Sequence, residues 1–161
     1  MSKTIELSQG YVAIVDDEDY EYLSQSNWHA RNTPNGVYAV SNRNGTTIQM
    51  HRIILNAPKN LMVDHRDRNG LNNTRGNLRL STRSQNLMNS KKPNKGKTSK
   101  YKGVHFLKKA GESAKSWRSE IRLNKRAIYL GVFHTEIEAA LAYNAAALKY
   151  FGEFAKLNEV T

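Results

Sequence analysis

Four polar residues between positions 64 and 86 include the residue types that hydrolysis of a phosphodiester needs. Asp64 and His65 are adjacent, Asn77 lies twelve residues after the histidine, and Asn86 nine residues after that. An imidazole can take a proton from water near neutral pH. A carboxylate and a carboxamide can supply oxygen ligands to a hard divalent cation. These types assign His65 as a general base, and Asp64 and Asn86 as metal ligands.

The elements that must position these residues follow from the sequence around them. A short apolar strand, residues 61–65, ends in the Asp-His pair, and residues 78–80 form a second short strand after a loop rich in Gly and Asn. Thr82 and Gln85 have the spacing of a capping box, which predicts the start of a helix. The module is therefore strand, loop, strand, helix, and we expect the amide of Asn77 to pin backbone groups of the loop.

The segment VDHRDRNGLNNTRGNLRLSTRSQNLMN resembles the HNH endonucleases with their ββα-metal fold, in the version of phage and intron-encoded homing endonucleases. The resemblance covers roughly residues 1–90. It implies that His65 is the general base, that Asp64 and Asn86 hold the metal, and that Asn77 is the structural asparagine. Asparagine at the third motif position is typical of the single-metal homing and nicking branch.

This resemblance implies a metal-dependent DNA endonuclease of homing or nicking type that leaves 5′-phosphate and 3′-hydroxyl ends. Mg²⁺ is the expected ion, with Mn²⁺ as a substitute. The chain has no cysteine, which excludes disulfides and cysteine-ligated zinc, and we expect no zinc. One nuclease module per chain favours a monomer that nicks duplex DNA, with a dimer as the alternative.

The charge of the chain is unevenly distributed. Residues 1–60 carry six acids and five bases, whereas residues 61–161 carry eight acids and twenty bases, within a net charge of +11. Such a concentration of Lys and Arg suits a phosphate backbone, although a basic surface or a ribosome-associated protein has the same composition. Beside the nuclease motif, phosphate contacts are expected from Arg66, Arg79 and Arg83.

His51 and Arg52 allow two interpretations. His51 could be a buried or edge histidine bonded to backbone. Alternatively, His51 or Arg52 stands beside the scissile phosphate and contacts DNA as electrostatic support.

A basic linker separates two predicted domains. Residues 91–100 contain Lys91, Lys92, a proline and a glycine and no residue suited to a core, so they are expected to connect the domains and to lie along phosphates. The predicted nuclease domain is 1–90, with its ββα core at about 61–90, and the second domain is 101–161.

The second domain has the pattern of a three-stranded antiparallel sheet packed on one helix. Hydrophobic and polar residues alternate along the strands, which predicts a sheet with one packed and one polar face. Thr135 and Glu138 form a second capping box, which starts an alanine-rich helix that Gly152 ends. The expected core is small and lies around Trp117, Phe133, Tyr143 and Leu148. The fold class of the whole chain is α+β, with a small β-rich segment preceding the ββα module.

The motifs YKGV, WRSEIR, YLGVF, EAALAY and LN, in this order over residues 99–159, resemble an AP2 domain. This family implies binding of double-stranded DNA through the polar face of the sheet, with Arg122 as the best candidate for a base contact. Several base-reading positions of the plant domains are occupied here by other residue types, so the resemblance implies no target sequence. The expected DNA-binding residues are Lys102, His105, Arg118, Glu120, Arg122, Arg126 and Tyr129.

The composition predicts a soluble, cytoplasmic protein, and the resemblance to phage and intron-encoded endonucleases implies that this is the cytoplasm of the host cell of a phage or mobile element. The first ten residues lack the apolar run of a signal peptide, and no stretch approaches the roughly 18 apolar residues of a membrane span. Two other functions remain as alternatives: a non-catalytic sequence-specific DNA-binding regulator with a degenerate nuclease module, and an RNA-binding or ribosome-associated basic protein.

Overall fold

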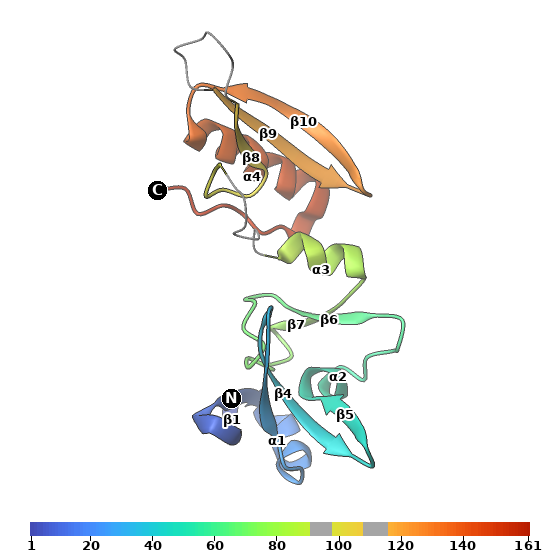
Figure 1. Cartoon of the computed structure of the whole chain (residues 1–161). Coiled ribbons are helices and arrows are strands. Elements are labelled where there is room, and N and C mark those ends of the chain that lie inside the picture. Colours follow the sequence, from blue (N-terminus) through green and yellow to red (C-terminus); the bar gives the residue numbers. More distant parts are fainter. Residues whose placement is uncertain (91–97, 108–115) are drawn as a thin grey trace. The chain divides into compact units, whose positions relative to one another are not determined.

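The computed structural model of the chain describes residues 1–90, 98–107 and 116–161. It divides into two compact units, Met1–Asn86 and Leu87–Thr161 (Figure 1). The division falls within the helix that follows the nuclease motif. Most of the predicted linker, including Lys91 and Lys92, lies outside the described residues.

The first unit contains three small antiparallel sheets, with strand orders β1-β2, β3-β4-β5 and β6-β7. Its elements, followed by the helix that straddles the two units, are β1 (Ser2–Glu6), η1 (Ser8–Gly10), β2 (Val12–Asp16), α1 (Asp17–Ser24), β3 (His29–Thr33), β4 (Gly36–Arg43), β5 (Thr46–Gln49), α2 (Met50–Ile54), β6 (Met62–His65), β7 (Leu78–Ser81) and α3 (Arg83–Asn89).

Sequence patterns predict most of these elements, and the exceptions have a physical reason. Strands β1 and β3 each bury a single side chain, Ile5 and Ala30, so neither shows the alternation that identifies a strand. Residues 46–50 are rich in β-branched side chains and favour a strand, but β5 ends at Gln49 and α2 begins at Met50. The predicted capping box is confirmed, because the backbone N–H of Thr82 donates to Gln85 and that of Gln85 donates to the Thr82 hydroxyl.

The core of the first unit joins the three sheets and both short helices. Val15 from β2, Leu23 from α1, Ala39 from β4 and Met50 from α2 are essentially inaccessible to solvent, and Val63 of β6 packs into the same cluster. One face of the β6-β7 hairpin is thereby attached to the rest of the unit, which is what a four-residue strand pair needs in order to be stable.

The loop between β6 and β7 is attached to the rest of the unit at two places. Its backbone pairs with Ile14 of β2, which accepts a hydrogen bond from Asn73 N–H and donates one to the Leu71 carbonyl. On the other side Gly70 lies against β4 so closely that a Cβ atom there would stand 2.4 Å from the Val37 oxygen and 2.6 Å from the Tyr38 ring. The loop therefore has a fixed path between β2 and β4.

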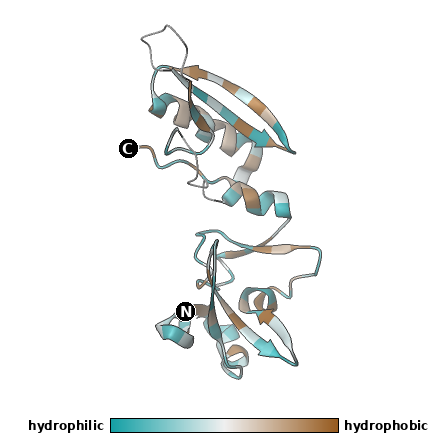
Figure 2. Ribbon diagram, viewed as in Figure 1, coloured by the Kyte–Doolittle hydropathy of each residue, from teal (hydrophilic) through white to brown (hydrophobic). Residues whose placement is uncertain are grey.

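The second unit is a three-stranded sheet, ordered β10-β9-β8, with one helix packed along one of its faces (Figure 1). Hydrophilic and hydrophobic bands alternate along its strands (Figure 2), as the sequence predicts. Its elements are β8 (Val104–Leu107), β9 (Ser116–Leu123), β10 (Arg126–Phe133), α4 (Glu136–Phe151) and η2 (Gly152–Phe154). The α+β fold class and the AP2-like arrangement of sheet and helix are thus confirmed.

Helix α4 starts at the predicted capping box of Thr135 and Glu138, in which both reciprocal hydrogen bonds are present. Its alanine-rich face packs against the sheet, and Tyr143 is buried beside Ile121. The assignment of Leu148 to the core is wrong, since its side chain is 56% exposed on the outward side of the helix. No helix among the described residues is long and apolar enough to cross a membrane.

We predict that Gly70→Ala lowers the free energy of unfolding of the first unit by about 1–3 kcal/mol, because the added methyl group overlaps the Val37 oxygen and the Tyr38 ring. Gly76→Ala is the matched control in the same loop, where a Cβ meets nothing within 4 Å. Urea unfolding, with hydrogen exchange assigning the transition to residues 1–86, measures both changes. Equal stability of the two variants would contradict the close packing at Gly70.

Candidate active site

His65 ends β6, where it contacts two other rings and an asparagine. Its side chain is 5% exposed, and its Nε2 lies 3.3 Å from Oδ1 of Asn73, which is fully buried. The His51 ring meets it edge-on at a centroid distance of 5.1 Å, and the Tyr38 ring lies 5.9 Å away. Because an amide oxygen can only accept, the contact with Asn73 requires a proton on Nε2 of His65.

Both buried histidines are electrically neutral near pH 7. Burial lowers the pKa of His65, while the hydrogen bond to Asn73 and the charges of Asp67 and Asp64 oppose the shift. Burial, with smaller contributions from His65 and Arg52, lowers the pKa of His51 to about 3. A neutral imidazole is the form of histidine that can accept a proton, so His65 is held in the state that a general base needs.

The loop that follows His65 is held by hydrogen bonds between side chains and backbone. Asn77 donates from Nδ2 to the Asp67 carboxylate and to the Asn72 carbonyl, and its Oδ1 accepts from Asp67 N–H. Asp67 also accepts from Asn69 N–H and from Asn72 Nδ2. The expectation that the Asn77 amide pins the loop is therefore confirmed.

Burial alone would raise the pKa of Asp67, but hydrogen bonds from Asn69, Asn72 and Asn77 hold that pKa below its usual value. The carboxylate consequently stays ionised and keeps accepting these bonds at neutral pH.

Asp64 faces the opposite side of the β6-β7 hairpin from His65, because consecutive side chains of a strand alternate. Its directly opposed residue on β7 is Arg79, whose Nε and Nη2 donate to Oδ2 of Asp64 at 2.8 and 2.6 Å. Both side chains are less than 8% exposed, so this is a buried ion pair.

Asn86 lies on the same side of the hairpin as Asp64. Its Nδ2 approaches the sulfur of Met62 at 3.9 Å, and Met62 shares a strand face with Asp64, two residues away. A carboxylate and an amide oxygen on one face fit a cation such as Mg²⁺, which takes few protein ligands and retains several waters. Within residues 1–90, 98–107 and 116–161, no three His, Asp or Glu side chains form a metal-ligating group.

The residues that the sequence assigned to DNA contact in the first unit have different environments. His51 is buried and neutral. Its Nδ1 has no hydrogen-bond partner among the described residues, so this nitrogen does not bond their backbone. Arg52 donates to three carbonyls of the turn before β6, and Arg79 belongs to the ion pair with Asp64. Arg66 and Arg83 are exposed, as a phosphate contact requires.

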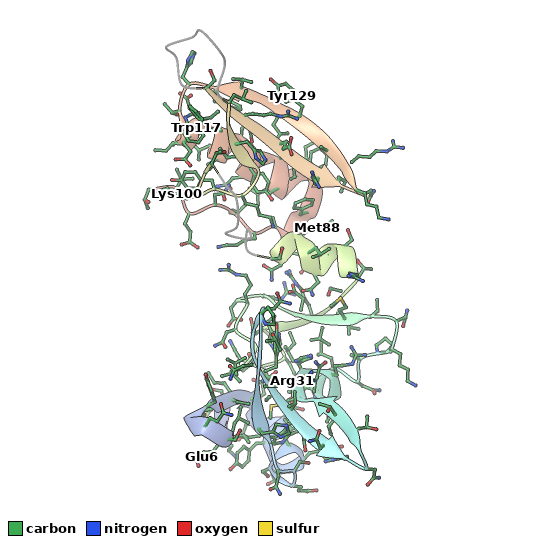
Figure 3. All side chains as sticks on the ribbon, in the orientation of Figure 1. Glu6, Arg31, Met88, Lys100, Trp117 and Tyr129 are labelled. Atoms are coloured by element: carbon green, nitrogen blue, oxygen red, sulfur yellow. The ribbon has the colours of Figure 1, made fainter. Side chains whose placement is uncertain are left out.

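In the second unit the residues assigned to DNA contact gather on the sheet face that is opposite α4. His105 pairs with Arg118 across β8 and β9, and Glu120 pairs with Tyr129 across β9 and β10. Arg118 Nη2 lies 2.8 Å from Glu120 and its guanidinium lies over the ring of Tyr129, which is labelled in Figure 3. Arg122 is exposed two residues further along the same face.

Two other assigned residues lie away from this face. Lys102 donates from Nζ to the Met88 and Ser90 carbonyls at the end of α3, and its backbone bonds the side chain of Asn158. Arg126 is exposed at the first position of β10, opposite Leu123, whose side chain packs towards α4.

Comparison with known proteins agrees with this geometry. The sequence profile of the HNH endonucleases matches residues 56–88, which span β6, β7 and most of α3. An uncharacterized HNH endonuclease of Acanthamoeba polyphaga mimivirus is 32% identical over 158 residues, covering 94% of this chain and 77% of that protein. The chain belongs to the HNH endonuclease family. No solved structure matches it.

The remainder of this HNH protein is similar to plant transcription factors. An AP2-like ethylene-responsive transcription factor of Arabidopsis thaliana is 38% identical over 77 residues, and an APETALA2-like protein of Oryza sativa subsp. indica is 43% identical over 63 residues. These matches cover 48% and 38% of this chain, but only 15% and 13% of the plant proteins. The similarity is therefore confined to one domain, in agreement with the AP2 motifs.

Sequence reasoning missed three residues of the HNH site. Asn73 bonds His65, Asp67 organises the loop, and Tyr38 contacts both histidine rings. The Asn- and Asp-rich loop signalled side chains that bond backbone, which could have drawn attention to Asn73 and Asp67. Nothing near the motif pointed to Tyr38, because it reaches the site from a different sheet.

We predict that Arg79→Met costs about 3–5 kcal/mol of stability, because it leaves the buried Asp64 carboxylate without its ion-pair partner. Combining it with Asp64→Asn should recover part of this loss. Arg75→Met is the control, since it removes the ion pairs that the half-exposed Arg75 makes with Glu18 and Asp19 and should cost about 1 kcal/mol or less. Urea unfolding of the four proteins measures these differences, and equal effects of the two arginine variants would argue against the buried pair.

We also predict that the unfolding free energy falls as pH is lowered from about 6.5 to 5. The unfolded chain protonates His51 below about pH 6.5, whereas the folded protein does not until about pH 3. Each proton that the unfolded chain binds and the folded protein does not changes the free energy of unfolding by up to about 1.4 kcal/mol per pH unit. His51→Phe should reduce the slope of unfolding free energy against pH by the contribution of up to one proton. His134→Phe, which replaces an exposed histidine, serves as the control. Unfolding titrations across this range would contradict the burial of His51 if its variant kept the wild-type slope.

Proposed function

We propose that this HNH protein is a site-directed, metal-dependent DNA endonuclease of homing or nicking type. It hydrolyses a phosphodiester to 5′-phosphate and 3′-hydroxyl ends, and its AP2-like domain positions it on duplex DNA. The observation that carries the proposal is the environment of His65: a neutral ring bonded to Asn73, at the start of a loop that Asn77 pins.

In the proposed reaction His65 takes a proton from the attacking water. Its Nε2 already carries the proton that it donates to Asn73, so the incoming proton is accepted at Nδ1. The Asn73 oxygen then stabilises the imidazolium, as the direction of its effect on the pKa of His65 indicates. The rings of Tyr38 and His51 limit the orientations that the imidazole can adopt.

Asp64 and Asn86 are proposed to hold the divalent cation, with Mg²⁺ as the natural ion and Mn²⁺ as a substitute. When bound, this cation would stabilise negative charge on the phosphate and on the departing 3′ oxygen. Arg79 orients the Asp64 carboxylate through two hydrogen bonds.

The exposed face of the AP2-like sheet supports the proposed placement on DNA. Arg122 and Tyr129 are exposed there, and Arg118 is held between Glu120 and the Tyr129 ring. Arginine on a sheet can read guanine edges in the major groove, and an aromatic side chain can contact sugars or thymine methyl groups. A single nuclease module on such a domain favours nicking by a monomer.

A second candidate function is a DNA-binding regulator whose nuclease module is inactive. One observation favours it: Oδ2 of Asp64 is already bonded to two nitrogens of Arg79, which competes with a cation for the same carboxylate. The two functions share the AP2-like domain and differ only in whether DNA is cut.

We predict that wild-type protein nicks supercoiled plasmid DNA in Mg²⁺ or Mn²⁺ and not in EDTA. His65→Ala should lower the rate by a factor of about 100 or more, as expected for removal of a general base. His134→Ala is the matched control, because it removes an exposed histidine from the other unit and should leave the rate unchanged. Agarose electrophoresis follows the conversion, and labelling of the cut ends identifies the terminal phosphate and hydroxyl.

Equal rates for wild-type protein and His65→Ala would remove His65 as the base. DNA binding with no cleavage in either metal, over many sequences, would favour the regulator instead.

A further inference from the structure

One face of the β3-β4-β5 sheet connects the catalytic histidine to the protein surface. Tyr38 of β4 contacts the rings of His51 and His65, so its side chain points to the site. Arg31 of β3 is directly opposite Tyr38 in the antiparallel register. Opposed residues project from the same face with their Cβ atoms about 5 Å apart, so Arg31 stands next to Tyr38 on the side of His65.

Exposure distinguishes Arg31 from the residues around it. His51 and His65 are each 5% exposed, and Tyr38 is partly buried, whereas Arg31, labelled in Figure 3, is exposed. Further along the same face Val40 is 1% exposed, in the stretch where α2 packs on β4. The face is therefore covered at Val40 and open at Arg31, and Tyr38 joins the open part to the buried histidines.

Arg31 and Lys59 have no hydrogen-bond or ion-pair partner inside the described protein, whereas the other three bases of residues 1–60 have one. Lys3 pairs with Asp17, Arg43 bonds the Ser26 hydroxyl, and Arg52 bonds three backbone carbonyls. An exposed arginine costs side-chain entropy to immobilise, which an anionic ligand can offset through paired N–H donors. Its guanidinium has the geometry that binds a phosphate in two parallel hydrogen bonds.

We propose that Arg31 binds a backbone phosphate of the DNA beside the scissile bond, with Tyr38 as the wall that separates this phosphate from His65. The inference rests on the proposed nuclease function and adds to it a phosphate subsite on a sheet outside the HNH motif. It also gives the N-terminal segment, which is slightly acidic overall, a role in holding the substrate.

The test is the salt dependence of DNA binding by the full chain, measured without divalent metal on a labelled random-sequence duplex. Arg31→Gln should lower the slope of log affinity against log salt by about 0.9, the contribution of one phosphate contact. Arg31→Lys keeps the charge and should keep the slope. Arg43→Gln is the matched control, because Arg43 is an exposed arginine on the opposite face of β4 and should keep the wild-type slope.

A plasmid-nicking assay on the same proteins separates this inference from the proposed function. A lower slope for Arg31→Gln alone supports the contact even if the wild-type protein does not cut DNA. Equal slopes for wild-type protein and Arg31→Gln, in a protein that does nick, overturn the contact and leave the nuclease intact. An equal loss in the Arg43→Gln control also overturns it, because the effect would then be one of net charge.

Discussion

The hydrogen bonds among Asp67, Asn72 and Asn77 are the interaction on which the arrangement of the site depends. They close the twelve-residue connection between β6 and β7 into one path, and Ile14 of β2 holds that path from outside. These hydrogen bonds help to offset the conformational entropy that the loop loses when it becomes ordered. Asn73, which bonds His65, is part of this loop, so the orientation of the imidazole follows from the closure of the loop rather than from β6 alone.

A second consequence of the hairpin is the separation of chemical roles by strand alternation. Asp64 and His65 are neighbours in the chain but face opposite sides of β6, one towards Arg79 and Asn86 and the other towards Tyr38 and His51. A hairpin with four residues in each strand thus places a buried ion pair on one side and a buried, neutral imidazole on the other. Each side is completed by residues from other elements, which is why neither can be understood from the motif by itself.

The two units are stabilised by different kinds of interaction. In the first unit polar side chains of the loop after β6 bond each other and the backbone, which fixes the loop beside His65. In the AP2-like unit the alanine-rich face of α4 allows the helix to approach the sheet, and the side chain of Tyr143 packs so tightly on Gly103 that a Cβ there would be 2.1 Å from the ring. That packing supports a sheet whose outward face carries Arg118, Arg122 and Tyr129.

The sequence by itself determined the local structure: the ββα order, both capping boxes, the alternation of the C-terminal strands, and the residue types of the nuclease motif. These follow from short-range spacing, which backbone geometry converts directly into faces and helix starts. Tertiary structure alone decided that Arg79 forms an ion pair with Asp64, that Leu148 faces outward, and that Tyr38 and Asn73 contact His65. Such contacts join residues from separate elements, and nothing in the local sequence encodes which surfaces meet.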